Sequence, residues 1–238
     1  MADKSQNNLC SYSMLLIAAD TSGKHGSIAL ARCEPNASCA VLEVVPLAGG
    51  TFSAQLVPQI AALLAKHGFS KRDIGAFAVA SGPGSFTGLR VGLAAIKALV
   101  EILGKPVATV SLLEAVASAG AGRSRGRVIA ALDAGRNEVY VGEYEIGETA
   151  TVLSERLLTR EEFLAAVGGR ALVTPDKSIA DLARGAGAHV EEIARPRSDA
   201  IARLGWKKIL AGETVSPEAL EANYIRRSDA EIFSKTNF

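Results

Sequence analysis

Two short polar segments carry the residue types that bind phosphate or another anion. Asp20, Thr21 and Ser22 directly follow an apolar stretch that predicts a strand. The segment Ser-Gly-Pro-Gly-Ser-Phe-Thr-Gly-Leu-Arg, residues 81–90, follows a second such stretch and continues into a helical pattern. A Gly-rich turn between a strand and a helix exposes backbone N–H groups at the positive end of the helix dipole. The candidate residues of this second segment are Gly82, Gly84, Ser85, Thr87 and Gly88.

Each segment also has a plain structural interpretation. Asp20 and the two hydroxyl residues after it fit an Asx-type turn that reverses the chain between two strands. The glycines fit a turn that needs them only for its backbone dihedral angles. The sequence therefore leaves open whether this site still binds anything.

Four segments, taken in order, resemble the TsaB (YeaZ) family. They are residues 15–22 with the strand pattern 26–30 that follows, the Gly-rich segment 81–90, Ile-Ala-Ala-Leu-Asp-Ala-Gly-Arg-Asn-Glu-Val-Tyr at 129–140, and Asn-Tyr-Ile-Arg-Arg-Ser-Asp-Ala-Glu at 223–231. The resemblance runs from about Met14 to Glu231, with the Gly and Arg of 129–140 placed slightly differently from the family's block. It implies an α/β fold of the actin/Hsp70-like (ASKHA) kind, with two ribonuclease-H-like lobes built on mixed sheets.

The order of predicted elements supports two lobes. Strands are expected at 14–20, 27–33, 39–46 and 75–80, with helices at 53–66 and 85–103. Further strands are expected at 106–110, 128–132, 139–144, 151–156 and 171–174, with helices at 112–119, from Thr159 and at 179–185. We expect a disordered tail at 1–13, a first lobe at 14–104 with a returning helix at 198–212, a second lobe at 105–197 and a C-terminal segment at 213–238.

The resemblance implies a protein with no catalytic residues of its own. It would be the non-catalytic partner of TsaD, with TsaE, in forming threonylcarbamoyladenosine next to the anticodon of tRNAs that read codons beginning with A. It would form a homodimer when alone, meet tRNA indirectly through the complex and require no cofactor, with ATP or ADP a candidate ligand of the complex with TsaD and TsaE. The alternative is an autonomous nucleotide-dependent phosphotransferase of the actin-like superfamily.

The histidine spacing disfavours metal-dependent chemistry. TsaD adds a His-x-x-x-His motif on a helix, where two imidazoles four residues apart lie on one face. Here the histidines are His25, His67 and His189, and Phe52 stands where TsaB relatives often carry a histidine. We expect no metal site, and neither peptidase nor carbamoyl-transfer chemistry by this chain alone.

The two predicted helices of the first lobe have more apolar surface than one core contact needs. Small residues at Gly84, Gly88, Gly92 and Ala95 form a row apart from the apolar stripe of the second helix. This row either packs under the first helix of the same lobe or belongs to an interface with TsaD or a second copy. The candidate interface residues are Leu56, Ile60, Leu63, Leu64, Phe86, Leu89, Gly92 and Ala95.

Charged residues of the second lobe admit two interpretations. Asp133, Arg136 and Glu138 fit either a hairpin turn with a local ion pair or the lining of an inter-lobe nucleotide cleft. Arginines in a Gly-rich loop and near the C-terminus could meet tRNA phosphates or stay solvated. These are Arg123, Arg125, Arg127, Arg226 and Arg227.

Composition sets the remaining limits. A net charge of +1 gives no overall field that would attract nucleic acid. Cys10, Cys33 and Cys39 lack a Cys-x-x-Cys spacing, which predicts reduced packing thiols in a cytoplasmic protein. Residues 1–13 lack the apolar stretch of a signal peptide or membrane anchor.

Overall fold

A computed structural model describes residues 13–120, 126–147 and 149–225. In this part the chain divides into two compact units, one made of residues 13–110 and 197–222 and the other of residues 111–196 and 223–225 with the gaps given above. Residues 1–12 of the predicted tail, which include Cys10, and the arginines at 123, 125, 226 and 227 lie outside the described residues. Among the described helices, none is long and apolar enough to cross a membrane.

The first unit is built on a mixed sheet. Its described strands are β1 (Met14–Asp20), β2 (Gly26–Cys33), β3 (Cys39–Leu47), β4 (Ile74–Gly82) and β5 (Val107–Ser111), in the order β3-β2-β1-β4-β5. β1 pairs antiparallel with β2, β2 antiparallel with β3, and β1 parallel with β4. Its helices are α1 (Phe52–Lys66), α2 (Phe86–Leu103) and α6 (Ser198–Leu210), with a short 3-10 turn η2 (Lys71–Asp73) before β4.

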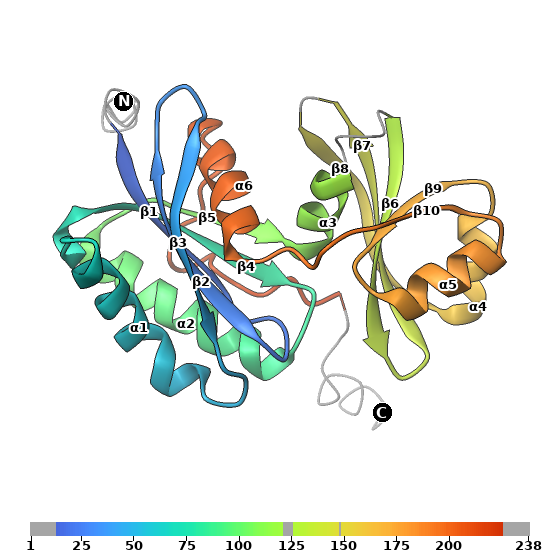
Figure 1. Ribbon diagram of the computed structural model, residues 1–238, viewed down its shortest axis with the longest axis horizontal. Coiled ribbons are helices and arrows are strands. Elements are labelled where there is room, and N and C mark those ends of the chain that lie inside the picture. The colour runs from blue at the N-terminus through green and yellow to red at the C-terminus, as the bar shows by residue number, and fades with distance from the viewer. Residues whose placement is uncertain (1–12, 121–125, 148, 226–238) are drawn as a thin grey trace, which may run out of the picture. The chain divides into compact units, whose positions relative to one another are not determined.

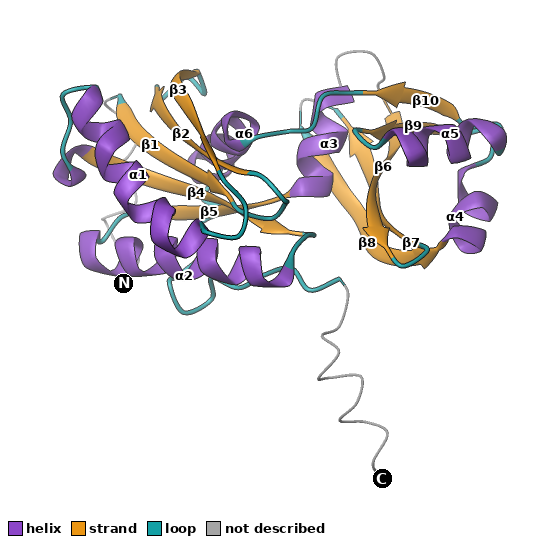
Figure 2. Cartoon of the chain, turned by 60° about the horizontal axis from the view of Figure 1, so that its bottom comes forward, coloured by secondary structure: helices purple, strands orange, loops and turns teal. Residues whose placement is uncertain are grey.

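Side-chain size separates the two faces of this sheet. Because side chains alternate along a strand, Phe77 and Val79 of β4 face the core under α1 and α2, while Ala78 and the alanines two residues before and after it lie on the opposite face, toward α6. Gly205 of α6 approaches this alanine face so closely that a Cβ there would lie 2.4 Å from the Cβ of Ala78. Figures 1 and 2 show α1 and α2 on one side of the sheet and α6 on the other. The strands β1, β2 and β4 are thus buried on both faces.

The second unit repeats the same strand order. Its described strands are β6 (Gly126–Gly135), β7 (Glu138–Ile146), β8 (Ala150–Thr159), β9 (Ala171–Thr174) and β10 (His189–Glu192), in the order β10-β9-β6-β7-β8. β6, β7 and β8 form an antiparallel meander, and β9 lies parallel to β6. The helices α4 (Arg160–Val167) and α5 (Lys177–Gly185) cover a core that includes Ile129, Phe163 and Ile179. α3 (Leu112–Gly120) packs on β6 and β7.

Two helices belong to the unit that does not contain the strand before them. α3 follows β5 of the first unit in the chain but packs in the second unit. α6 follows β10 of the second unit but packs on β1, β2 and β4 of the first. The indole of Trp206 on α6 is buried there, and its Nε1 donates a hydrogen bond to the carbonyl of Glu34 at 2.9 Å.

Candidate functional site

The turn after β1 is an Asx turn. Asp20 ends β1 and is 7% exposed. Its Oδ1 accepts hydrogen bonds from the backbone N–H of Ser22 at 2.9 Å and from the Ser22 hydroxyl at 2.5 Å. This geometry is the plain structural interpretation of the segment, because the carboxylate holds the turn that leads into β2.

The small residues of the Gly-rich segment face this turn. A Cβ at Gly84 would lie 2.4 Å from the Ser22 carbonyl oxygen, and one at Gly88 would lie 2.1 Å from the Thr21 carbonyl oxygen. A Cβ at Gly92, one turn further along α2, would lie 2.2 Å from Thr21 Oγ1. The three glycines therefore pack against the β1–β2 turn, and the expectation that they pack under α1 is wrong.

Hydrogen bonds join the turn and the N-terminus of α2. The backbone N–H of Ser85 donates to the Ser22 carbonyl at 2.6 Å, and Thr21 Oγ1 donates to the Gly88 carbonyl at 2.7 Å. Ser85 is the N-cap of α2, and its hydroxyl oxygen accepts from the Gly88 N–H at 3.3 Å. The Gly88 N–H, which an anion at the helix N-terminus would use, is thus already bonded to the Ser85 oxygen.

The remaining candidates of this segment lie beside the same turn. Gly82 ends β4 with a φ of 113°, a backbone conformation that favours glycine, and Thr87 is exposed in the first turn of α2. The structure therefore brings Asp20, Thr21 and Ser22 together with the Gly-rich segment, as the sequence led us to expect. Several polar groups that could receive a phosphate are paired with one another.

The second-lobe candidates form a turn of their own. The Asp133 Oδ1 accepts from the Gly135 N–H at 2.8 Å, and Arg136 follows with a φ of 53°, which places Arg136 in the β6–β7 turn before Glu138. The hairpin interpretation describes this geometry. These residues belong to the second unit, whereas Asp20 belongs to the first.

Asp176, which contacts Asp133 beside this second turn, is a residue that sequence reasoning missed. It follows β9, and its Oδ2 accepts from the Asp133 N–H at 2.8 Å. Its Oδ1 accepts from Arg195 at 2.6 Å. The available signal was its place after a strand parallel to β6, because the carboxyl ends of neighbouring parallel strands meet at one edge of a sheet.

Most of the predicted interface residues are buried inside the first unit, so that prediction is wrong for them. Leu56, Ile60, Leu63, Leu64, Leu89 and Gly92 are buried, and the five leucine and isoleucine side chains join the unit's own core. The physical reason is that α1 packs on β2 and β3 and also on α2, so both of its apolar faces are covered within the unit.

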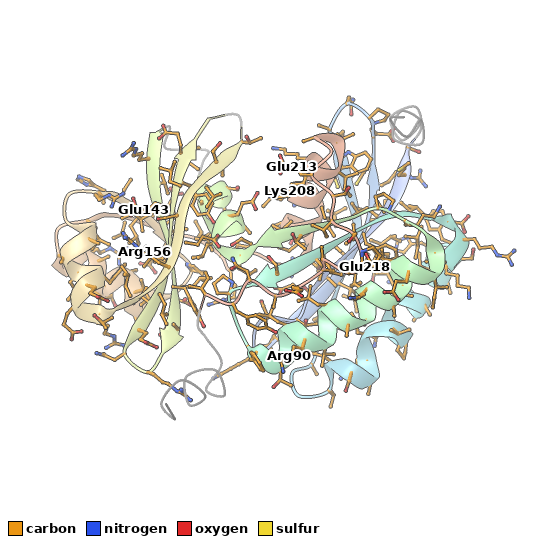
Figure 3. The ribbon with its side chains drawn as sticks, turned by 180° about the vertical axis from the view of Figure 1, so that it is seen from behind. Arg90, Glu143, Arg156, Lys208, Glu213 and Glu218 are labelled. Carbon is orange, nitrogen blue, oxygen red and sulfur yellow. The ribbon has the colours of Figure 1, made fainter. Side chains whose placement is uncertain are left out.

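Two candidates and two further residues keep exposed surface on these helices. Ala95 is half-buried, and Phe86 is 37% exposed with the Arg90 guanidinium 3.6 Å from its ring centroid. Val57 on α1 and Ile102 on α2 are 46% and 75% exposed. Figure 3 labels Arg90 on α2.

The described histidines, cysteines and carboxylates form no group of three or more that could hold a metal ion. His67 lies 2.9 Å from Glu43, which also accepts a hydrogen bond from Lys66 at 2.7 Å. The hydrogen bonds from Lys66 and then His67 lower the pKa of the Glu43 carboxyl. Phe52, at the position where a histidine was considered, lies in the apolar core, and its ring atom Cε1 would be 2.9 Å from a Cβ at Gly26.

Strand order and the β1–β2 turn define the class of protein. An antiparallel meander extended by a parallel strand, present in both units, is the arrangement of ribonuclease-H-like sheets, and their duplication is that of the actin-like α/β proteins. The fold class expected from the sequence is confirmed.

Comparison with known proteins identifies the family. A family model described as "TsaD: tRNA N6-adenosine threonylcarbamoyltransferase" matches residues 44–223. A protein of Escherichia coli named tRNA threonylcarbamoyladenosine biosynthesis protein TsaB is 30% identical over 190 residues, covering 74% of this chain and 81% of that one. A Bacillus subtilis protein of the same name is 27% identical over 233 residues, covering 92% of this chain and 96% of that one. The chain belongs to the family of the TsaD model and, within it, to the TsaB (YeaZ) family.

Solved structures agree with this assignment. A structure described as YeaZ from Pseudomonas aeruginosa has a TM-score of 0.70 at 25% identity and covers 89% of this chain and 99% of its own. A second structure from that organism, described as similar to peptidase YEAZ, has a TM-score of 0.72 and covers 90% of this chain and 100% of its own.

Proposed function

We propose that this chain acts in the formation of threonylcarbamoyladenosine in tRNA. Membership of the TsaB family and the names of the relatives from Escherichia coli and Bacillus subtilis support this role. The modified adenosine would be the one next to the anticodon in tRNAs that read codons beginning with A. The protein would work in the cytoplasm, meet tRNA through the complex and require no cofactor of its own.

Within that process, the chain would be a non-catalytic partner of a TsaD enzyme, joined by TsaE. The observation that carries this proposal is the closed β1–β2 turn, where Ser85 caps the Gly88 N–H and the Thr21 hydroxyl bonds to the Gly88 carbonyl. Groups that an actin-like enzyme would turn toward a phosphate are here bonded to one another. A site occupied by its own side chains stabilises the unit instead of binding a substrate.

The partner surface would be the outer side of α1 and α2. Burial of Leu56, Ile60, Leu63 and Leu64 removes them from that surface, which keeps the exposed candidate Phe86 and gains the exposed Val57. Apolar side chains that remain exposed on adjoining helices favour association with another protein. The same surface would form the homodimer when the chain is alone.

Reconstitution with TsaD, TsaE, tRNA and threonylcarbamoyl-adenylate tests the role. Modification is expected with the full set and is expected to fall to background when this chain is omitted. Unchanged modification without the chain would contradict the proposal. The chain alone with ATP is expected to release no ADP above the buffer control, and steady ADP release would favour the autonomous phosphotransferase instead.

Two variants test the surface. Val57→Glu places a charge on the outer side of α1, and we expect loss of co-elution with TsaD together with loss of modification. Leu153→Glu, at a 49% exposed position on β8, is the matched control and should behave as the parent chain. Equal loss in both variants, or in neither, would remove α1 from the partner surface.

A further inference from the structure

Cys33 and Cys39 are neighbours across β2 and β3. Cys33 ends β2, Cys39 begins β3, and the antiparallel register places the two residues directly opposite each other. Their Sγ atoms are 2.8 Å apart, and both thiols are free. A disulfide bond needs about 2.05 Å between its sulfurs, so less than about 1 Å of sulfur movement separates this pair from a bond.

We propose that Cys33 and Cys39 form a reversible thiol–disulfide site that reacts with a small-molecule disulfide such as oxidised glutathione. The sequence predicted packing thiols because the two cysteines are not spaced as Cys-x-x-Cys. The structure adds the strand register, which brings the thiols together across a five-residue connection. Thiols held face to face react with each other at a far higher effective concentration than thiols on a free chain.

The two thiols have different surroundings. Cys33 is fully buried, whereas Cys39 is half-buried at the start of β3, an edge strand of the sheet. The hydrogen bond from Cys33 lowers the pKa of the Cys39 thiol, and Arg203 on α6 adds to that effect. The hydrogen bond to Cys39 and then burial raise the pKa of the Cys33 thiol. Because the thiolate is the nucleophile, Cys39 is the attacking residue.

Oxidation takes place in two exchange steps. The Cys39 thiolate attacks one sulfur of oxidised glutathione, forms a mixed disulfide and releases one glutathione thiolate. Cys33 then gives up its proton and attacks Cys39 Sγ, which forms the Cys33–Cys39 bond and releases the second glutathione thiolate. Each released thiolate takes up a proton, so two protein thiols are oxidised and one glutathione disulfide is reduced to two thiols.

The fluorescence of Trp206 can report the state of the two thiols. The residue after Cys33 is Glu34, whose carbonyl accepts the hydrogen bond from the Trp206 indole at 2.9 Å. Trp206 is the single tryptophan of the sequence. Closing the bond at Cys33 changes the strand end next to this carbonyl, so the emission of Trp206 should shift as the disulfide forms.

The experiment uses the full chain with Cys10→Ser, which leaves only the two thiols of the site. The chain is equilibrated in glutathione redox buffers, native and in urea, then free thiols are trapped with a maleimide and located by peptide mass mapping. We expect a Cys33–Cys39 disulfide whose equilibrium constant is at least about tenfold larger in the native chain than in urea. The shift in Trp206 emission should follow the same titration.

Two serine variants in the Cys10→Ser background separate the roles. Cys33→Ser keeps the attacking thiol and should stop at a glutathione adduct on Cys39. Cys39→Ser keeps only the buried thiol and should react at least about tenfold more slowly. Equal disulfide constants in native buffer and urea, or a stable Cys39 adduct beside a free Cys33 in the parent chain, would overturn the proposal, and neither outcome depends on the folding of the serine variants.

Discussion

The two units share a strand order and differ in what meets the turn after their first strand. In the first unit, the Gly-rich N-terminus of α2 packs closely against Thr21 and Ser22. In the second unit, the carboxylate of Asp176 accepts the N–H of Asp133. In each unit the contacting segment follows a parallel neighbour of the first strand, β4 beside β1 in the first unit and β9 beside β6 in the second.

This difference shows which part of the duplicated fold is free to vary. The strand order fixes where the carboxyl ends of the two central parallel strands meet. The segment after β4 or β9 then decides which groups lie at that edge. They are backbone and hydroxyl groups in the first unit and a carboxylate in the second. A carboxylate already bonded to the Asp133 N–H and to Arg195 disfavours a second anion there.

The largest expected effect comes from filling the glycine contact in the first unit. In Gly88→Ala the new Cβ would meet the Thr21 carbonyl at 2.1 Å, a backbone atom that cannot move without shifting the turn. We expect the free energy of unfolding of this unit to fall by about 3 kcal/mol. Urea unfolding is followed by Trp206 emission, which reports the first unit, and by far-UV circular dichroism, which reports both units.

The matched control is Gly185→Ala in the second unit. A Cβ at the end of α5 would meet nothing within 4 Å, so this change should leave stability equal or slightly higher. Equal loss in the two variants would mean that the close approach at Gly88 is not what makes the first unit sensitive.

Removing the carboxylate of the second unit should have a smaller effect. Asp176→Ala leaves the Asp133 N–H and Arg195 without this acceptor, and about 1–2 kcal/mol of stability should be lost. Amide hydrogen exchange at Asp133 should become faster. Asp181→Ala removes one partner of an exposed ion pair with Arg184 and should change stability by less than about 0.5 kcal/mol.

A near-isosteric change tests the hydroxyl bond of the first unit. Thr21→Val keeps the side-chain shape and removes the hydrogen bond to the Gly88 carbonyl, so we expect a loss of about 1 kcal/mol. Thr151→Val, at an exposed position of β8, should be neutral. A neutral Thr21→Val in thermal unfolding would show that the turn does not depend on this hydroxyl bond.

The smallest effect is expected from acid titration of the second unit's surface. Glu143 on β7 accepts from Arg156 of β8 and from Arg170, each at 2.7 Å, as the labelled Glu143 and Arg156 illustrate (Figure 3). The hydrogen bond from Arg170 is the main cause that lowers the pKa of this carboxyl below its ordinary value of 4.5.

The direction of the pH dependence of stability follows from that lowered pKa. Because the pKa is lower in the folded state, the stabilisation is present above pH 4.5 and is lost as the pH falls through the folded-state pKa. Glu143→Gln should therefore flatten the acid side of the stability profile of the second unit, measured by thermal unfolding between pH 3 and 6 (about the range that brackets carboxyl titration). An unchanged profile would contradict the role of this carboxylate.

Much of the fold could be predicted because hydrophobic periodicity is a local signal. The strand 14–20 and the helix that starts at Thr159 were both readable from neighbouring residues. β10 was missed because His189–Glu192 is short, polar and at a sheet edge, so it carries little apolar pattern.

The site was predictable only in part, because its contacts depend on residues far apart in the chain. Asp20 and the Gly-rich segment were found from their positions after strands. The contact between Gly88 and the Thr21 carbonyl could not be found from these positions. Periodicity predicts that a helix face is buried, but it does not say which residues cover that face. For the same reason the second apolar face of α1, which packs on α2, was interpreted as surface for another protein.

The exchange of α3 and α6 between the units constrains how the polypeptide folds during synthesis. The first sheet lacks the helix over its alanine face until residues 198–210 have been made, because α6 comes from near the end of the described chain. A fragment that stops after β5 would therefore expose Ala78 and its neighbours to water. Supplying a separate peptide that carries α6 should restore that fragment, which makes the protein a natural starting point for a split reporter.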